Sequence, residues 1–345
     1  MKVTIDDVAK EADVSITTVS RVINNNYPVK EETRKRVEKA IEKLNFHPNI
    51  LARGLINQKT DTVGIIVPSN TNLFFPTVVK GIDSVLRKKG YTIYLCDSDN
   101  NENEEIRYVK SLLGRMVDGI IVIDPQTTNV KSGFYEKISK EVPLVCINGY
   151  NEGIHCNFVL NNEETGTIEA MEYLISLGHK KIAFVRGEKS YSYDLKERVY
   201  KKILDKYGCD QYIKIINVGY GNNDYTVDNT MKTILQVLNN PNAPTAFFAC
   251  NDIMALGVLN ACKRMGLNVP EDISVIGFDN IIISKLSEPK ITTVDQNMYT
   301  LGETAAEMLL KCIDKNTNKI TNKSKGSERI VFNTRLIIRE SCKKL

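Results

Sequence analysis

The first 45 residues carry the spacing of amphipathic helices and no strand pattern. Thr4 and Ser15 stand where the N-caps of a first and a second helix are expected, and Asp13 and Val14 form a tight turn between the two helices. A third helix is predicted over about residues 31–45. The apolar positions that share the inward faces are Val8, Ala9, Ala12, Val19, Val22, Ile23, Val37, Ala40, Ile41 and Leu44. Three such helices predict a small bundle with one thin core.

From residue 62 the pattern changes to short apolar runs that alternate with amphipathic stretches. The predicted strands are Val63–Val67, Ile93–Cys96, Gly119–Ile123, Leu144–Ile147, Ile182–Val185, Ala246–Ala249 and Ser274–Phe278. The helical stretches between them lie near 76–89, 102–115, 164–177, 198–207, 226–239 and 252–265. This alternation predicts βαβ units with buried parallel strands. About a dozen strands in all are too many for one small sheet, so we expect two doubly wound lobes.

Polar side chains follow most of these strands directly. They are Asn70, Asn72, Asp97, Asp124, Asn148, Asn161, Arg186, Asn251, Asp252, Asp279 and Asn280. Each one alone is typical of a helix cap or a turn. Together they mark the carboxyl ends of the strands, where open α/β sheets bind ligands. Two lobes that face each other would therefore line one cleft with polar groups.

The first two helices have the composition of a helix-turn-helix. Ala9 is small enough to let the helices approach, and Thr17, Thr18, Ser20 and Arg21 remain on the outer face of the second helix. That face is free to enter the major groove of DNA.

Residues 3–25, V-T-I-D-D-V-A-K-E-A-D-V-S-I-T-T-V-S-R-V-I-N-N, closely resemble the N-terminal signature of the lactose-repressor/galactose-repressor family. Asp13 departs from the glycine that is usual in the family's turn, but Asp tolerates left-handed backbone. The resemblance implies DNA contacts from Thr4, Ser15, Ile16, Thr17, Ser20, Arg21 and Asn24.

The resemblance continues through Phe46-His-Pro-Asn49 and Leu51-Ala-Arg-Gly-Leu55, which are similar to the family's hinge helix. In that family the segment folds on operator DNA, and the leucine that matches Leu55 wedges into the minor groove. This implies DNA contacts from Asn49, Ala52, Arg53 and Leu55; an ordinary flexible linker is the alternative. Gly54 costs a short helix about 1 kcal/mol relative to Ala, which strengthens the dependence on DNA.

The same resemblance covers the rest of the chain and implies a fold in three parts. These are an all-α helix-turn-helix domain (1–46), a hinge (47–60) and a two-lobed α/β body similar to periplasmic binding proteins (61–345). We place the first lobe at about 61–158 plus 293–324 and the second at about 159–292 plus 325–341.

The resemblance also implies an effector site in the body. Its residues are Asn72, Phe74, Phe75, Asn148, Arg198, Tyr225, Asn251, Asp279 and Gln296. Leu73 and Lys201 depart from the proline and the glycine of the matching family motifs. Asn, Asp and Arg offer paired donors and acceptors for vicinal hydroxyls, and aromatic rings offer flat faces to a sugar, although Phe74 and Phe75 equally suit a core. We therefore expect a neutral or weakly acidic monosaccharide, with a purine as the alternative.

Composition and charge exclude several classes. The 345 residues are 42% hydrophobic and 26% charged, the balance of a globular protein, and residues 1–60 carry eleven Lys and Arg against eight Asp and Glu. The eight cysteines form no C-x-x-C pair, so we expect buried thiols in a reducing cytosol, with no metal and no cofactor. The absence of an export signal argues for a cytoplasmic protein and against an extracytoplasmic sugar receptor.

Two further expectations concern catalysis and assembly. Nucleotide-binding and nucleophile-elbow motifs are absent and there are only three histidines, so we expect no catalytic residues and no enzyme. The chain ends soon after Arg335–Glu340 without a heptad segment. We therefore expect a homodimer whose two recognition helices bind a pseudo-palindromic operator.

Overall fold

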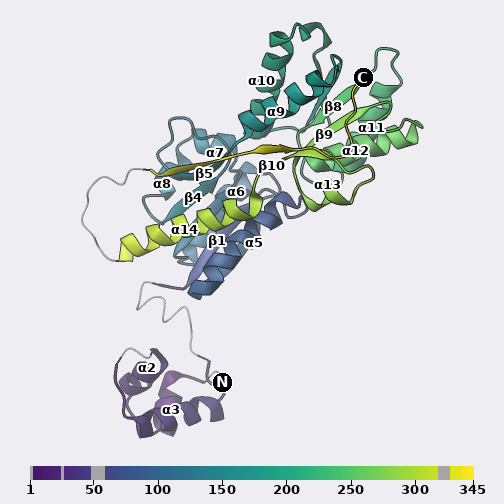
Figure 1. Cartoon of the computed structure of the whole chain (residues 1–345). Helices are drawn as coiled ribbons and strands as arrows, with labels where there is room; N and C mark the ends of the chain where they lie inside the picture. Colours follow the sequence, from purple (N-terminus) through teal and green to yellow (C-terminus); the bar gives the residue numbers. More distant parts are fainter. Residues whose placement is uncertain (1–2, 25–26, 48–58, 318–326) are drawn as a thin grey trace. The chain divides into compact units, whose positions relative to one another are not determined.

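The computed structural model describes residues 3–24, 27–47, 59–317 and 327–345. The chain divides into two compact units, Met1–Thr60 and Asp61–Leu345 (Figure 1). The expected DNA contacts of the hinge, Asn49, Ala52, Arg53 and Leu55, lie outside the described residues.

The N-terminal unit contains the three predicted helices, α1 (Ile5–Glu11), α2 (Ile16–Asn24) and α3 (Glu31–Lys43). Thr4 and Asp7 form a capping box at α1, since each side chain accepts a hydrogen bond from the backbone of the other residue. Asp13 has φ 52°, as the turn requires, and the Ser15 Oγ accepts from the Thr18 N–H at 3.2 Å. The small core consists of Val8, Ala9, Ala12, Val19, Val22, Val37 and Ala40. The helix-turn-helix expectation is confirmed.

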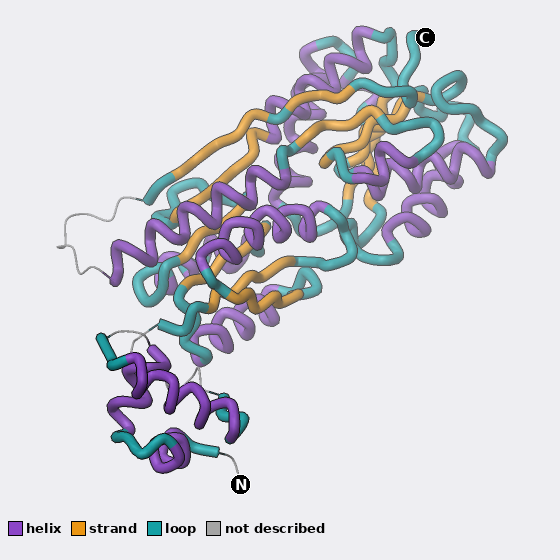
Figure 2. Tube along the Cα trace, turned by 60° about the horizontal axis from the view of Figure 1, so that its bottom comes forward, coloured by secondary structure: helices purple, strands orange, loops and turns teal. Residues whose placement is uncertain are grey.

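The body contains two sheets of six strands each (Figure 2). The order of the first sheet is β11-β5-β4-β3-β1-β2, and that of the second is β12-β10-β9-β8-β6-β7. Every pairing is parallel except that of β10 with β12. The strands of the first sheet are β1 (Thr62–Val67), β2 (Thr92–Asp97), β3 (Gly119–Ile123), β4 (Leu144–Ile147), β5 (Asn157–Asn162) and β11 (Arg329–Asn333). Those of the second are β6 (Ile182–Arg186), β7 (Lys214–Asn217), β8 (Ala246–Ala249), β9 (Ser274–Asp279), β10 (Thr292–Asp295) and β12 (Arg335–Ile337).

Helices cover both faces of the sheets, as the near-continuous apolar strands predict. In the first lobe, Val63, Ile65 and Val67 of β1 point into one core, while Ile66 points into another. The helices of the body are α5 (Phe74–Leu86), α6 (Glu102–Gly114), α7 (Thr127–Lys131), α8 (Phe134–Ile138), α9 (Glu163–Ser176), α10 (Tyr191–Lys206), α11 (Thr226–Leu238), α12 (Asp252–Arg264), α13 (Ile282–Leu286) and α14 (Met298–Thr317). Two 3-10 helices, η1 (Arg87–Lys89) and η2 (Asp210–Tyr212), complete the set.

Helices α5 and α14 cross at very short range on one face of the first sheet. A Cβ atom at Gly302 would lie 2.1 Å from the carbonyl oxygen of Val78, and one at Gly81 would lie 2.1 Å from that of Tyr299. Backbone therefore meets backbone at this crossing, which only glycine permits.

The chain crosses between the two lobes three times. The crossings follow β5 at Asn162, follow β10 at Asp295, and join β11 to β12 at Thr334, where Figure 1 shows one long segment running from sheet to sheet. The expected lobe boundaries differ here, because β5 and β11 pair with each other in the first sheet and β10 belongs to the second. Residues of β11 alternate between exposed and half-buried, so this edge strand carries a weak apolar signal.

Of the helices in the described part of the chain, none combines the length and the hydropathy that a bilayer-spanning segment requires.

Candidate functional site

The exposed face of α2 carries the residues expected to contact DNA. Thr17 and Arg21 are exposed and Ile16 is 46% exposed, while Val19 and Val22 on the opposite side are buried. The Arg21 guanidinium lies 4.7 Å from the centroid of the Tyr27 ring. A polar and cationic helix face on a rigid bundle is the geometry that enters a major groove.

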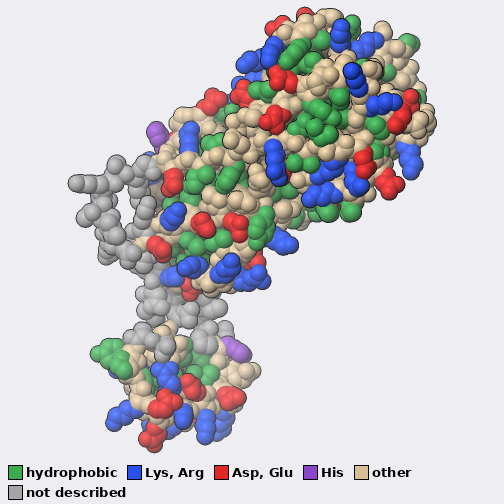
Figure 3. All heavy atoms as spheres, viewed as in Figure 1, with side chains coloured by type: hydrophobic (Ala, Val, Ile, Leu, Met, Phe, Trp, Pro, Cys, Tyr) green, Lys and Arg blue, Asp and Glu red, His purple; other side chains and the backbone are tan. Residues whose placement is uncertain are grey.

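The remaining expected DNA contacts lie around this face. Thr4 and Ser15 are exposed, and each of them caps a helix. Ser20 and Asn24 are half-buried, and the Asn24 amide donates to the Ser20 hydroxyl at 3.2 Å. Figure 3 shows Lys and Arg side chains interspersed with Asp and Glu on the visible surface of this unit. This agrees with the small excess of cations in residues 1–60, eleven Lys and Arg against eight Asp and Glu.

The cleft between the two lobes of the body holds a small inner cavity of about 30 Å³. Seven of the nine expected effector residues line it: Asn72, Phe74, Phe75, Asn148, Asn251, Asp279 and Gln296. They come from the carboxyl ends of strands and the adjoining helix starts of both lobes, as the sequence predicts. A volume of this size holds about one water molecule, so the lobes are closed on each other.

Arg198, the eighth expected residue, is not in the cavity. It is exposed on α10 and its side chain bonds with that of Tyr191. Lys196 lines the cavity instead and is only 2% exposed. Side chains two positions apart on a helix point about 200° away from each other, so Lys196 faces the cleft while Arg198 faces away from it.

Tyr225, the ninth expected residue, is also outside the cavity. It precedes α11 and is 69% exposed. Asn222, in the loop just before it, closes the cleft. The Asn72 amide donates to the Asn222 Oδ1 at 2.7 Å, and the Ser69 hydroxyl donates to the Asn222 carbonyl at 2.6 Å. A polar contact between the lobes thus stands where the sequence suggested an aromatic cover.

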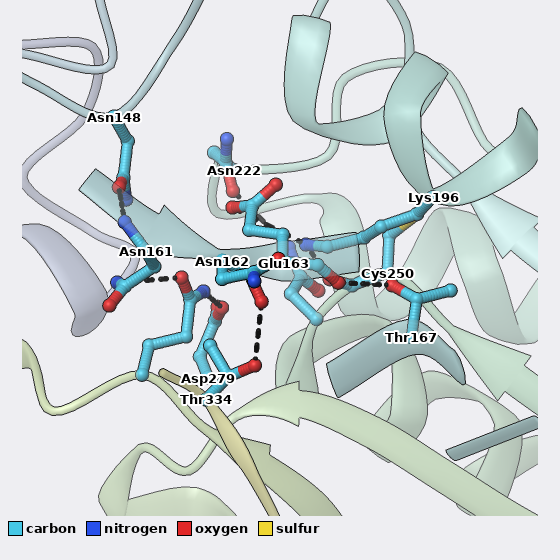
Figure 4. Close-up of polar contacts among 12 residues, drawn as sticks. Asn148, Asn161, Asn162, Glu163, Thr167, Lys196, Asn222, Cys250, Asp279 and Thr334 are labelled. Atoms are coloured by element: carbon cyan, nitrogen blue, oxygen red, sulfur yellow. Dashed lines mark hydrogen bonds and ion pairs between the residues drawn. The ribbon is translucent and has the colours of Figure 1, made fainter. Parts of the chain in front are cut away.

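A chain of hydrogen bonds links the two lobes through their crossings (Figure 4). The Asn148 Oδ1 accepts from the Asn161 N–H at 2.9 Å, and the Asn161 amide donates to the Gln296 Oε1 at 3.0 Å. The Gln296 amide in turn donates to the Asp279 Oδ1 at 2.5 Å. Asn148 and Asp279 have φ values of 55° and 105°. Such backbone is sparsely populated by non-glycine residues and marks positions that the surroundings force into place.

Phe74, Phe75 and Asn251 each have a structural role as well as a place on the cavity wall. The two rings pack edge to face with centroids 5.3 Å apart and belong to the core of the first lobe. The Asn251 Oδ1 accepts from the Met254 N–H at 2.9 Å, which caps α12, and its amide donates to the Gly221 carbonyl at 2.8 Å. The two phenylalanines therefore belong to the core and also line the cavity, and their contact with an effector stays a prediction.

Three charged groups lie at the floor of the cavity, Asp124, Glu163 and Lys196. Asp124 belongs to the predicted row of polar side chains at strand ends, whereas the sequence interpretation missed Glu163 and Lys196. The Lys196 ammonium donates to the Cys250 carbonyl at 3.2 Å, lies 4.0 Å from the Glu163 Oε1, and sits 3.7 Å from the centroid of the Phe278 ring. The spacing of a buried lysine within a helix gave no signal, because α10 carries charges on several faces.

Burial dominates the electrostatics of this floor. It raises the pKa of Asp124 to about 7, where the negative charge of Glu163 adds to the effect and Lys196 opposes it. Burial also raises the pKa of Asp279, and Lys196 again opposes the shift. Behind the cavity, burial raises the pKa of Asp252 to about 7, although it accepts hydrogen bonds from Thr293 and Ile281.

A second, wider cavity of about 690 Å³ is lined by residues of both lobes. It shares Ser190 with the inner one. Its lining residues are Asp99, Asn100, Asn101, Glu102, Asn103, Gln126, Thr127, Thr128, Lys189, Ser190, Asp194, Tyr220 and Asn223. Within the described residues, no group of three or more His, Cys, Asp and Glu side chains is arranged to hold a metal ion.

Comparison with known families gives two matches along the chain. Residues 4–49 match the model described as bacterial regulatory proteins, lacI family. Residues 171–342 match the model of a periplasmic binding protein-like domain.

Relatives and solved structures extend these matches over the whole chain. The chain is 39% identical over 320 residues to catabolite control protein A of Priestia megaterium. That alignment covers 92% of this chain and 94% of the relative. It is 35% identical over 346 residues to the HTH-type transcriptional repressor PurR of Aliivibrio salmonicida. That alignment covers 99% of this chain and 99% of the repressor.

Among solved structures, the lac repressor dimer bound to operator and the anti-inducer ONPF superposes with a TM-score of 0.84 at 27% identity, over 99% of this chain and 100% of that one. A LacI family transcriptional regulator from Enterococcus faecium with bound ribose superposes with a TM-score of 0.70 at 28% identity, over 82% of this chain and 99% of that one.

Proposed function

This chain belongs to the lacI family of bacterial regulatory proteins, and from that premise we propose that it represses sugar-utilisation genes under the control of a monosaccharide bound between its lobes. It would bind a pseudo-palindromic operator as a homodimer in the cytoplasm. The observation that carries the proposal is the row of polar side chains from both lobes around one cleft, in a chain that also presents the exposed helix face of Arg21.

Support for the DNA part comes from α2 and from the similar regulators. Thr17 and Arg21 are the exposed polar residues of that helix best placed to reach base edges. The lac repressor, which this chain resembles along its whole length, is recorded as a dimer on operator DNA. The two relatives are named a catabolite control protein and a transcriptional repressor, and we propose no catalysis for this chain.

Support for a sugar comes from the chemistry of the cavity wall. Asn148, Asn251 and Asp279 offer amide and carboxylate groups in fixed positions, and Phe74 and Phe75 offer apolar faces. A similar regulator has ribose bound. Tyr225, whose ring was expected to cover either kind of ligand, is exposed, so a purine stays the alternative.

A monosaccharide requires the lobes to open. The inner cavity of about 30 Å³ is too small for a sugar ring, so the contacts of Asn222 with Ser69 and Asn72 must break first. Ligand entry would then replace these contacts between the lobes with contacts to hydroxyl groups. This exchange provides the differential binding that couples an effector to a change of conformation.

The test begins with selection of an operator from randomised palindromic DNA by the purified full chain. Fluorescence anisotropy then measures the affinity for that operator with and without pentoses, hexoses, uronates and purines. We expect one class of sugar to change operator affinity at least tenfold. Asp279→Ala should abolish this response, whereas Arg198→Ala, which alters an exposed residue outside the cavity, should preserve it. A response confined to purines, or a response that survives Asp279→Ala, contradicts the proposal.

A further inference from the structure

The cleft carries more carboxylates than cations. Three acids, Asp124, Glu163 and Asp279, line the inner cavity against the single cation Lys196. The outer cavity repeats the imbalance, with acids Asp99, Glu102 and Asp194 against the single cation Lys189. Of these acids Arg186 contacts Asp194, at 2.7 Å, and it shares its charge with Glu197, which lies outside both cavities. A ligand that enters this cleft therefore meets an excess of negative charge in both parts.

Lys196 does not satisfy these acids. At 4.0 Å from the Glu163 Oε1 its ammonium is beyond hydrogen-bond distance, and it donates to the Cys250 carbonyl instead. Among the described residues, the Asp279 carboxylate accepts a hydrogen bond from Gln296, while no hydrogen bond reaches the carboxylate of Asp124 or Glu163. The buried carboxylate of Glu163 and the half-buried one of Asp124 are thus open to donors that a ligand would bring.

A second unsatisfied group lies in the same cavity. Tyr193 lines it and is 5% exposed, and its hydroxyl has no hydrogen-bond partner of acceptable geometry, although it lies beside Asn222. A buried hydroxyl without a partner destabilises the protein, and a ligand that bonds to it recovers this loss. Three side chains that line the cavity can therefore bond to polar atoms of a ligand, and they come from α9, α10 and the end of β3.

We propose that the effector is an amino sugar whose protonated amine lies among Asp124, Glu163 and the Tyr193 hydroxyl. The inference rests on the proposed function, since it names the kind of sugar that the cleft takes. An ammonium brings three donors and one positive charge, which match the oxygens that lack partners. A neutral sugar would leave the excess carboxylates uncompensated when the lobes close, and a phosphorylated sugar would add like charge to them.

The protonation of Asp124 supports the same assignment. Burial raises the pKa of this carboxyl to about 7, with Glu163 and Glu105 raising it further and Lys196 lowering it. In the empty protein a proton therefore neutralises part of the excess charge near neutral pH. An ammonium competes with that proton, so the affinity for an amino sugar falls as the pH drops from 7.5 to 5.5, while that for a neutral sugar stays level.

The experiment compares matched sugars on the full chain by titration calorimetry. The probes are glucosamine and galactosamine, their neutral parents glucose and galactose, and N-acetylglucosamine, which keeps the nitrogen but loses the charge. We expect an amine to bind at least tenfold more tightly than its neutral parent and its acetylated form at pH 7.5, with at least threefold weaker binding at pH 5.5. The wild-type comparison needs no variant, so it stands even if a cavity variant fails to fold.

Variants locate the amine. Asp124→Asn and Glu163→Gln should each reduce the preference of amine over parent sugar to threefold or less, whereas Glu340→Gln, which removes an exposed acid outside both cavities, should keep it. Equal or tighter binding of the neutral sugars overturns the inference and leaves the proposed function in place. If no sugar of either kind binds, both fail. A preference that survives both cavity variants places the amine elsewhere and also overturns the inference.

Discussion

Replacement of Lys196 by Met tests whether the charge of this lysine stabilises the acidic floor of the cleft. The side chain is almost fully buried, and Met keeps its unbranched shape, one atom shorter, while removing the charge. The variant loses the hydrogen bond to the Cys250 carbonyl, the contact with the Phe278 ring and the attraction to Glu163. It leaves the carboxylates of Asp124, Glu163 and Asp279 without a neighbouring cation inside the cavity.

The magnitude follows from these contacts. A charge-assisted hydrogen bond is worth about 1.5–3 kcal/mol, a desolvated cation–π contact about 2 kcal/mol, and unit charges 4.0 Å apart attract by about 4 kcal/mol at an effective dielectric of about 20. The desolvation of a buried ammonium offsets several kcal/mol of that sum. We therefore expect Lys196→Met to lower the free energy of unfolding by about 3 kcal/mol at pH 8, in the range for breaking a buried ion pair. At pH 5.5 the loss should be about 1 kcal/mol, because Asp124, whose pKa burial raises to about 7, then binds a proton and no longer needs the cation.

Urea unfolding of the full chain, followed by circular dichroism at both pH values, measures the loss as a shift in the midpoint of the transition of the body. Arg198→Met on the same helix is the matched control. It removes an exposed cation and should change the free energy of unfolding by no more than about 0.5 kcal/mol at either pH. Equal losses for the two variants, or a loss for Lys196→Met that does not depend on pH, would refute the reasoning.

Three further predictions concern packing, pH and the contact between the lobes. Gly302→Ala should destabilise the body by about 1–3 kcal/mol, because its Cβ would lie 2.1 Å from the Val78 carbonyl oxygen. Gly114→Ala, whose Cβ would meet no atom, should be neutral or slightly stabilising in the same urea titration. Similar effects of the two variants would contradict the close crossing of α5 and α14. The free energy of unfolding should fall by on the order of 1 kcal/mol from pH 6.5 to pH 8, because burial raises the pKa of Asp124 and Asp252 from 3.8 to about 7. The folded state therefore binds more protons than the unfolded state and loses this stability as the pH rises through 7. A calorimetric melting temperature that stays constant or increases over this range would count against the prediction. Asn222→Ala should widen the distribution of distances between the two lobes in small-angle scattering or spin-label measurements without ligand, since its side-chain contact with Asn72 of the other lobe is lost. An unchanged distribution would show that the Asn222 side chain does not hold the lobes together.

Much of the fold was predictable because its signals are local. The capping box at Thr4, the left-handed turn at Asp13 and the apolar runs of the central strands depend on a few adjacent residues. The polar row at the carboxyl ends of the strands follows from topology alone, and it brought Asn148 and Asp279 to the cavity as expected.

The rest depends on contacts between distant segments. Whether Lys196 or Arg198 faces the cleft is decided by the rotation of α10 about its axis, and that helix begins at Tyr191, seven residues before the predicted start. Lys196 is tolerated inside because Glu163 and the Cys250 carbonyl come from elements far away in sequence. Asn222 sits in a loop whose path no periodicity predicts. Polar contacts between segments that are far apart in the sequence were therefore the part of the site that the sequence could not predict.

The pairing of β5 with β11 has a consequence for the synthesis of the chain. Asn162 lies opposite Asn333, so the first sheet receives its last strand about 170 residues after the strand that it joins. At 5–20 residues per second, a ribosome leaves the edge of β5 uncovered for roughly 10–30 s. That edge carries the buried residues Phe158 and Val159, and an exposed apolar edge readily pairs with other chains. Until β11 emerges, the first lobe therefore has an open sheet edge at β5.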